Sequence, residues 1–304
     1  MLSLETPESV RKLQGVLRAK AKESPGYRFY ALYDKVYRRD ILSHAYARCR
    51  LKKGAAGVDG ETFEVIEAYG VERWLDELVQ ELRKKTYRCQ ALRRVWIPKA
   101  DGHQRPLGIP TIRDRVVQMA AVLVLEPIFD EDLPAEQHAY RAHHSAHGAV
   151  GEVQALLDQG YTEVVDADLS GYFEDIPHPE LMKCVARRVS DGRLLHLIKM
   201  WLEAGVEETD EQGRVHRTSR NKDQGRGTPQ GGVITPPTML RKTLLGTSFK
   251  RGWTDPIHDA DLLFVDLDSL HQRPDNLPTR IPIRPLQPVG NAARELLQLA
   301  DQQP

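Results

Sequence analysis

The chain has 304 residues, of which 40% are hydrophobic and 28% charged, the composition of an ordinary globular protein with one large domain or two small ones. Apolar runs stay well short of the ~18 residues that a membrane-spanning helix needs, and the N-terminus lacks the charged-then-apolar order of a signal peptide. We therefore expect no membrane contact. The formal net charge of zero conceals an asymmetry: residues 1–60 carry thirteen Lys and Arg against six Asp and Glu, residues 81–115 carry ten against three, and residues 126–180 reverse the balance with one against thirteen.

This charge pattern has two interpretations. A basic front and an acidic middle suit a polyanion-binding surface beside a cation-binding centre. The alternative is a set of solvated helix faces, where charge runs commonly occur. The three cysteines, Cys49, Cys89 and Cys184, are widely spaced and odd in number, which predicts reduced thiols and a cytoplasmic location.

Helices are expected over much of the first half of the chain. Residues 1–53 have the spacing of basic helices, and a glycine-rich loop with the turn signal Asp59-Gly60 follows at 52–62. Apolar residues from Val71 to Leu82 then recur at helical spacing. Residues 93–110 read as two extended segments around Asp101-Gly102, a hairpin whose prolines keep it out of a central sheet position.

The second half is expected to continue with a helix after Thr111 that Pro127 closes, a short helix at 148–157, a strand at 162–169, and helices at about 179–190 and 193–204. A polar stretch then leads to GTPQGG at 227–232. Beyond Thr235 the periodicity is poor and the end of the chain is rich in proline, so we expect residues 237–304 to be irregular.

The candidate chemistry centres on VVDADL. On a strand, Asp166 and Asp168 share one face, and no Lys or Arg stands beside them to compensate their charge. A divalent cation such as Mg²⁺, which takes one or two carboxylates plus substrate phosphates, would do so. The alternative is an aspartate that caps the following turn.

Two further stretches point to anion or nucleotide binding. Lys99 and Arg105, on the two arms of the expected hairpin, could hold one anion from both sides, although hairpin charges often serve only solubility. In GTPQGG, Pro229 fixes φ while Gly231 and Gly232 allow a close backbone approach, which also fits any tight turn.

In this order these stretches resemble group II intron-encoded reverse transcriptases and maturases. The resemblance covers residues 30 to 235 and rests on LYDKVYRRDILSHAY with GAAGVDGET, VWIPKADGHQRPLGIPTIRDRVVQMA, QHAYRAHHSAHGAV, VVDADLSGYFEDIPH and GTPQGGVITP. Ala139 and Ala142 depart from the family's Gly and Pro. The resemblance implies an α/β (in detail α+β) fold, a right-hand polymerase fingers–palm with an antiparallel palm sheet flanked by helices. It also implies a basic N-terminal extension at 1–62, fingers and partial palm at 63–236, and a divergent tail at 237–304.

The resemblance also implies roles for single residues. Asp168 corresponds to a catalytic, metal-binding aspartate, with Asp166 a less constrained neighbour, and Phe173 to the aromatic gate that excludes a ribose 2′-OH. Lys99 and Arg105 would hold the incoming triphosphate, Gln230 would contact nucleotide or template, and Arg93, Arg94 and Arg141 would bind RNA. The implied reaction is two-metal nucleotidyl transfer with Mg²⁺, dNTP, a DNA primer and an RNA template. Group II intron RNA is the implied partner.

The sequence departs from the family at one essential place, because it contains no Tyr-Ala-Asp-Asp. Asp261, within Asp259-Ala260-Asp261, is one candidate for the missing carboxylate. The other interpretation is that everything after about Thr235 is unrelated sequence following a truncation, with the maturase and DNA-binding domains absent. The expected function is then an impaired or inactive reverse transcriptase. The alternatives are a non-catalytic RNA-binding remnant and the product of a pseudogene.

Overall fold

The computed structural model describes residues 4–98, 104–138, 141, 144–160, 172–210, 212–228 and 233. The chain forms two compact units, Met1–Leu133 with Leu169–Ile257 and Pro134–Asp168 with His258–Pro304. Among the described residues, every helix is too short or too polar to cross a membrane.

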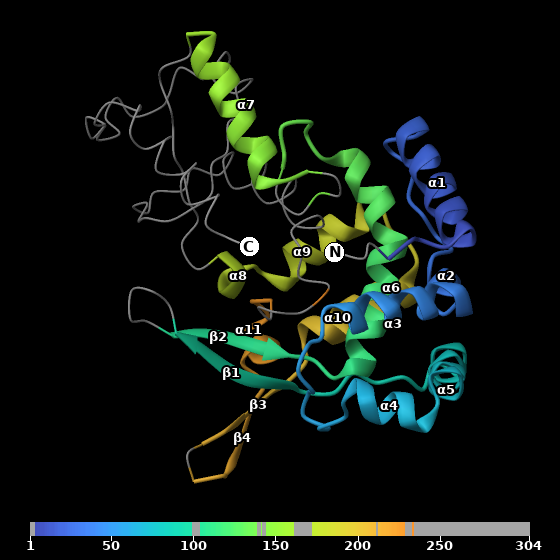
Figure 1. The fold of residues 1–304 in the computed structure, drawn as a ribbon, viewed down its shortest axis with the longest axis vertical. Helices are drawn as coiled ribbons and strands as arrows, with labels where there is room; N and C mark the ends of the chain where they lie inside the picture. The colour runs from blue at the N-terminus through green and yellow to red at the C-terminus, as the bar shows by residue number, and fades with distance from the viewer. Residues whose placement is uncertain are drawn as a thin grey trace. The chain divides into compact units, whose positions relative to one another are not determined.

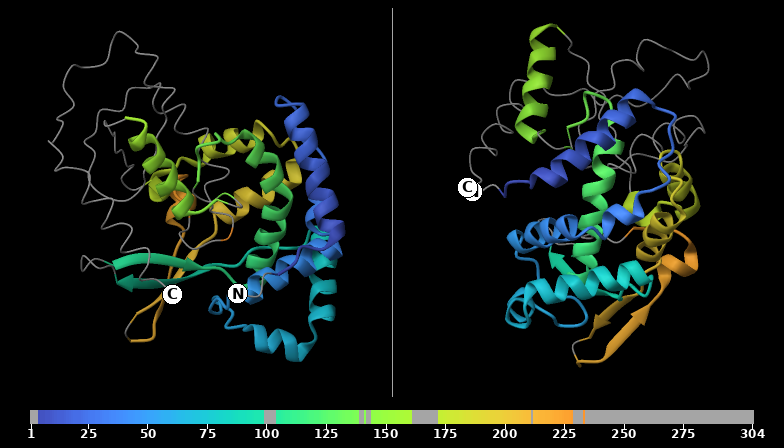
Figure 2. Two further views of the ribbon diagram at one scale, coloured as in Figure 1. Left: turned by 45° about the horizontal axis from the view of Figure 1, so that its top comes forward. Right: turned by 90° about the vertical axis from the view of Figure 1, so that its right-hand side faces the viewer.

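The first unit is a helical layer with a small sheet at its edge (Figures 1 and 2). Its helices are α1 (Glu8–Glu23), α2 (Tyr33–Val36), α3 (Arg39–Leu51), α4 (Phe63–Tyr69), α5 (Val71–Lys84), α6 (Ile112–Phe129), the 3₁₀ turn η1 (Asp130–Asp132), α8 (Tyr172–Asp175), α9 (His178–Ala186), α10 (Gly192–Leu202) and α11 (Arg220–Gln224). The expected α/β class is confirmed.

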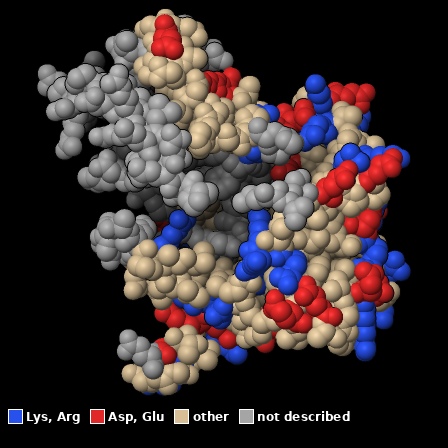
Figure 3. All heavy atoms as spheres, viewed as in Figure 1, with Lys and Arg blue, Asp and Glu red and all other residues tan. Residues whose placement is uncertain are grey.

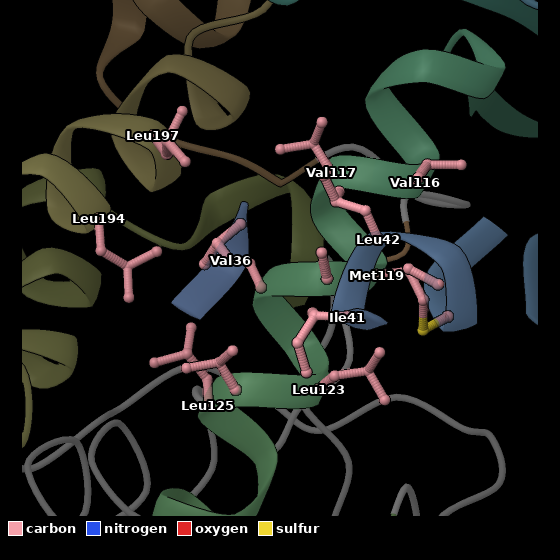
Figure 4. Packing of buried hydrophobic residues seen from close by; sticks show 14 of the residues in the cluster. Val36, Ile41, Leu42, Val116, Val117, Met119, Leu123, Leu125, Leu194 and Leu197 are labelled. Carbon is pink, nitrogen blue, oxygen red and sulfur yellow. The ribbon is translucent and has the colours of Figure 1, made fainter. Parts of the chain in front are cut away.

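Helix α6 is the centre of this unit. It begins at the N-cap Thr111, whose hydroxyl accepts the backbone N–H of Asp114, and most of its residues are buried on all sides. Helices α1 and α3 pack against it, and Figure 4 shows Ile41 and Leu42 of α3 among side chains of α6 such as Met119 and Leu123. The sequence suggested one apolar face, whereas the helix is enclosed because the N-terminal helices cover the side that would otherwise meet water.

Pro127 does not close this helix, contrary to expectation, and α6 runs on to Phe129. A proline inside a helix lacks the N–H that would bond the carbonyl four residues earlier, here that of Leu123. The side-chain Nε2 of Gln14 in α1 donates to the Leu123 carbonyl at 3.0 Å. A tertiary contact therefore satisfies the carbonyl that the proline leaves open.

The N-terminal helices share a core with the rest of the unit. Residues of α1 and α3, such as Leu17 and Ile41, lie in one hydrophobic cluster with Leu78 of α5 and Leu197 of α10. The predicted boundary at residue 62 thus falls between segments that pack together, and the domain limits at 62 and 236 stay predictions.

The sheet has the order β2-β1-β3-β4, from β1 (Leu92–Pro98), β2 (Gln104–Ile109), β3 (Val206–Thr209) and β4 (Val215–Thr218). Both hairpins are antiparallel, and β1 joins β3 in parallel at Leu92–Val206 and Arg93–Glu207. The hairpin at 93–110 is confirmed, with the proline-bearing β2 at the edge. Strand β1 is nevertheless an inner strand at its start, because Pro98 lies at its far end, away from β3.

The β3–β4 hairpin occupies what the sequence suggested to be a polar stretch. The side chains of β4 are exposed, so no alternation of apolar and polar residues marks it. The expected strand at 162–169 lies outside the described residues.

In the second unit the structure describes α7 (Ala146–Asp158) and the segment before it. The Ser145 hydroxyl caps this helix by accepting the Gly148 N–H at 3.1 Å. The helix predicted at 148–157 is therefore confirmed and begins two residues earlier.

Candidate functional site

The predicted site residues divide into two groups. Lys99, Asp166, Asp168, Gln230 and Asp261 lie outside the described residues, whereas Arg93, Arg94, Arg105, Arg141 and Phe173 lie within them. No group of three or more His, Cys, Asp or Glu side chains in the described part of the chain could hold a metal ion. The predicted metal ligands thus remain predictions.

Phe173 lies against the beginning of the GTPQGG segment. Its carbonyl accepts the backbone N–H of Thr228 at 2.6 Å and the Thr228 hydroxyl at 3.3 Å. The Phe173 side chain is half-buried and packs against the main core, while Thr228 is buried. Two stretches 55 residues apart in the sequence, both predicted to serve nucleotide binding, are therefore joined by direct hydrogen bonds.

His178, at the start of α9, also contacts the beginning of the GTPQGG segment. It is 7% exposed, and its Nε2 lies 2.7 Å from the Gly227 carbonyl. Because a carbonyl only accepts, Nε2 carries the proton. The N–H of Gly227 donates in turn to the carbonyl of Ile176 at 2.9 Å. Gly227 has φ of 90°, which a side chain would strain, so a glycine is required where the segment turns.

Gln118 bonds the chain directly after the other end of the GTPQGG segment. This buried side chain projects from α6, and its Oε1 accepts the backbone N–H of Val233 at 3.1 Å. The segment is thus fixed at Gly227–Thr228 by α8 and α9 and at Val233 by α6. Both residues lie within stretches that carry the family resemblance, but their roles were not predicted, because a single polar residue in a helix gives no periodic signal.

The two neighbouring arginines of β1 face opposite sides of the sheet. Arg93 pairs across the strands with Ile109, and its Nε donates to the carbonyl of Ala56 at 3.0 Å. Arg94 is on the other face, where its guanidinium lies 5.7 Å from the ring centre of Trp96. An RNA strand that lies on one face of the sheet therefore cannot contact both arginines.

Arg105 is exposed on β2, directly opposite Ile97 of β1. Cross-strand partners share a face, so Arg105 lies on the Arg93 side of the hairpin. This is the described half of the predicted Lys99–Arg105 pair.

The glycine-rich loop at 52–62 packs on the start of α6. Buried Arg115 donates to the Ala55 carbonyl, and burial lowers the pKa of this guanidinium. A Cβ on Gly57 would lie 2.6 Å from the Cα of Thr111, so only glycine allows this approach. Arg93 and Arg115 thus bind successive carbonyls and fix the loop to the base of the hairpin.

Basic side chains gather over α3 and the loop after it (Figure 3). Several of them are paired: Arg39 lies 2.9 Å from Asp76, and Arg50 lies 2.7 Å from Glu67. For these arginines the solvated, ion-paired helix face is the better interpretation of the basic N-terminus. Lys52 and Lys53 in the loop are exposed.

A buried polar network anchors the hairpin to the helices. The Tyr87 hydroxyl donates to Asp114 at 2.6 Å, the Trp201 indole donates to the Tyr87 oxygen at 3.1 Å, and the Gln90 N–H donates to Asp114 at 3.0 Å. Burial raises the pKa of Asp114 despite these bonds, and burial together with the nearby Asp114 raises that of Tyr87. The network joins the segment between α5 and β1 to α6 and α10.

Arg141, in the second unit, supports its own loop. One guanidinium nitrogen donates to the carbonyls of Pro134 at 2.8 Å and Ala135 at 3.4 Å. These contacts give Arg141 a structural role in this loop, and its predicted binding of RNA stays a prediction.

The chain resembles known proteins over most of its length. Residues 97–242 match the family described as reverse transcriptase (RNA-dependent DNA polymerase). The protein YkfC of Escherichia coli is 36% identical over 234 residues, which cover 75% of this chain and 58% of YkfC. The group II intron-encoded protein LtrA of Lactococcus lactis is 31% identical over 209 residues, covering 68% of this chain and 33% of LtrA.

A yeast relative extends this set. The COX1/OXI3 intron 1 protein of Saccharomyces cerevisiae is 31% identical over 197 residues, 65% of this chain and 22% of that protein. The chain thus spans little more than half the length of YkfC and a third or less of the two intron proteins.

Proposed function

This chain belongs to the family of group II intron-encoded reverse transcriptases and maturases, and from that premise we propose that it carries the fingers and part of the palm of an RNA-directed DNA polymerase. Its substrates would be an RNA template, a DNA primer and deoxynucleoside triphosphates, and its RNA partner a group II intron. We place this activity in the cytoplasm, in keeping with the free thiols of Cys49, Cys89 and Cys184.

The observation that carries this proposal is the contact between Phe173 and Thr228. A polymerase must hold the sugar and the base of an incoming nucleotide at once, and the two stretches expected to do so meet here. His178 bonds Gly227 and Gln118 bonds Val233, so the described residues on either side of 229–232 are held by α9 and α6 before a nucleotide binds. Such preorganisation is what nucleotide positioning requires.

Mg²⁺ is the cofactor we propose, with Asp168 as one ligand. When bound, it would neutralise charge on the triphosphate and activate the attacking hydroxyl. Asp168 and Asp261 lie outside the described residues, and the described residues supply contacts to the segments that we expect to face the nucleotide.

Primer extension on purified protein tests the proposal. We expect Mg²⁺-dependent extension that Asp168→Ala abolishes. Phe173→Val should increase incorporation of ribonucleotides relative to deoxyribonucleotides, because the smaller side chain leaves room for a 2′-hydroxyl. A wild-type protein that folds and binds primer–template but never extends it would overturn the proposal.

A second candidate is a non-catalytic RNA-binding protein. It is favoured by the absence of Tyr-Ala-Asp-Asp from the sequence, which leaves Asp261 as a single candidate for the opposing carboxylate. In that case RNA binding should persist without extension and weaken steeply with salt, since phosphate contacts dominate such binding. If both activities are absent, the chain is the inactive product of a pseudogene.

A further inference from the structure

A cavity of about 420 Å³ lies in the first unit at the junction of the sheet and two helices. It is bounded by the segment before β1, by the outer face of α10 and by α11. Its lining includes the side chains of Arg88, Cys89, His196, Lys199, Glu203 and Lys222. None of them belongs to the Phe173–Thr228 junction, and no motif of the sequence analysis includes them.

The charge of this cavity is unbalanced. Arg88, Lys199 and Lys222 contribute three cations, against the single carboxylate of Glu203. Glu203 lies 3.7 Å from the Lys199 Nζ, a loose pair beside the 2.8 Å pair of Lys183 and Glu180 on α9. Within the described part of the chain, the side chain of Lys222 has no hydrogen-bond or ion-pair partner. A net positive charge is therefore available to a ligand.

The helix α10 presents these groups by its periodicity. His196, Lys199 and Glu203 are spaced by three and four residues, so they form one stripe along the helix. The opposite face, with Leu194, Leu197, Ile198, Trp201 and Leu202, is buried in the core. The core thus fixes the direction in which the polar stripe faces.

Cys89, one of the residues that line the cavity, is neutral. The Cys89 thiol donates to the Met200 carbonyl at 3.4 Å, and burial raises its pKa to about 12, so it carries no charge at neutral pH. Arg88 donates to the carbonyls of Lys85 and Tyr87, which ties its guanidinium to the segment before β1. The lining of the cavity therefore combines a neutral thiol with three cationic side chains.

We propose that this cavity binds a phosphate ester, held by Lys199, Lys222 and Arg88. A cation-rich cavity of this size accommodates a phosphate with its attached sugar, and cationic side chains hold phosphate oxygens through charge-assisted hydrogen bonds. The phosphate is a phosphodiester of a bound RNA strand or belongs to a free nucleotide. The site extends the proposed function, because a strand bound here would contact the protein away from the nucleotide-facing segments.

Lysine footprinting on the wild-type protein distinguishes the two sources. The protein is acetylated briefly with and without a single-stranded oligouridylate, or with and without AMP, and each lysine is quantified by mass spectrometry. Protection of Lys199 and Lys222 by the oligouridylate alone identifies RNA, and protection by AMP as well identifies a site for free phosphate esters. Unchanged modification of both lysines with both probes would overturn the proposal.

A charge-matched pair of variants provides the second measurement. Lys199→Gln with Lys222→Gln should weaken oligouridylate binding several-fold and reduce the slope of log affinity against log salt by about 1, as expected for lost phosphate contacts. Lys12→Gln with Lys183→Gln removes the same charge from exposed positions outside the cavity. Equal losses in both pairs would show a non-specific charge effect and contradict the site. Neither measurement requires polymerase activity, so failure of the proposed function would be seen separately.

Discussion

The indole Nε1 of Trp96 donates a hydrogen bond to Oε1 of Glu208 at 2.7 Å. Trp96 lies in the middle of β1, beyond the two residue pairs that join β1 to β3 in parallel. The side-chain bond therefore extends the contact between the two hairpins past the point where their backbones separate. It braces the β1–β2 hairpin, which carries Arg93, Arg94 and Arg105, against β3.

Removing either partner of this bond should cost little stability but loosen the hairpin. Trp96 is 45% exposed, so we expect Trp96→Phe or Glu208→Ala to lower the free energy of unfolding by about 0.5–1.5 kcal/mol. The two changes together should cost less than their sum, because they remove one interaction. Urea unfolding of the four proteins in the double-mutant cycle measures this coupling. Strictly additive effects would show that the bond contributes nothing in solution.

Asp191 makes the stability of the fold depend on acid pH. One carboxylate oxygen accepts the backbone N–H groups of Leu32 and Tyr33, each at 2.8 Å, and the other accepts those of Arg193 and Leu194 at the start of α10. Burial alone would raise the pKa of this carboxyl, but the four backbone donors outweigh it and hold the pKa below its ordinary value of 3.8.

The sign of the effect follows from this lowered pKa. The folded state favours the ionised carboxylate, so its contribution is present above pH 3.8 and is lost as the pH falls through the lower, folded-state pKa. Asp191→Asn places an amide N–H₂ against backbone donors and should destabilise the protein by about 1–3 kcal/mol near neutral pH. The difference from wild type should shrink below pH 3.8 in urea unfolding. A difference that stays constant with pH would contradict this account.

Much of the fold could be predicted from the sequence, and the exceptions have physical causes. Helix α5 was predictable because Trp74, Leu75, Leu78, Val79 and Leu82 give it one apolar face, and all five are buried. The hairpin at 93–110 was predictable from its turn signal. The extent of α6 was not, because the group that satisfies the Leu123 carbonyl, the side chain of Gln14, is distant in sequence.

The sequence motifs of the candidate site could be predicted, whereas the side chains that hold these motifs in place could not. The stretches around Phe173 and GTPQGG carry distinctive residue types, so each could be singled out before their contact was known. Gln118 and His178 hold those stretches through single hydrogen bonds to backbone groups, which no residue pattern encodes. Likewise, the opposite directions of Arg93 and Arg94 depend on strand register rather than on their adjacency in the sequence.

The packing around α6 predicts a large cost for core truncation. Leu42 of α3 is fully buried and contacts the α6 cluster, so Leu42→Ala should lower the free energy of unfolding by about 2–5 kcal/mol through lost burial and a residual cavity. Val16 on α1 is 68% exposed. Val16→Ala should therefore change the free energy of unfolding by no more than about 0.5 kcal/mol. Denaturant titration compares the two variants. Similar midpoints for both would argue against α3 packing on α6 in solution.

His178 should affect nucleotide binding without touching the nucleotide. His178→Ala leaves the buried Gly227 carbonyl without its side-chain donor, which should cost about 1–3 kcal/mol of stability. The freed segment would position Thr228 and the residues after it less well. If the proposed polymerase function holds, we expect the KM for deoxynucleotide in primer extension to rise while kcat changes less.

Two comparisons separate this positioning role from general damage. His178→Gln keeps an N–H donor on a flexible side chain and should restore part of the lost affinity. The matched control is His147→Ala, which removes an exposed histidine of α7 and should leave the KM unchanged. If His178→Ala folds with wild-type stability, or if His178→Gln restores nothing, the hydrogen bond to Gly227 does not hold the segment in place.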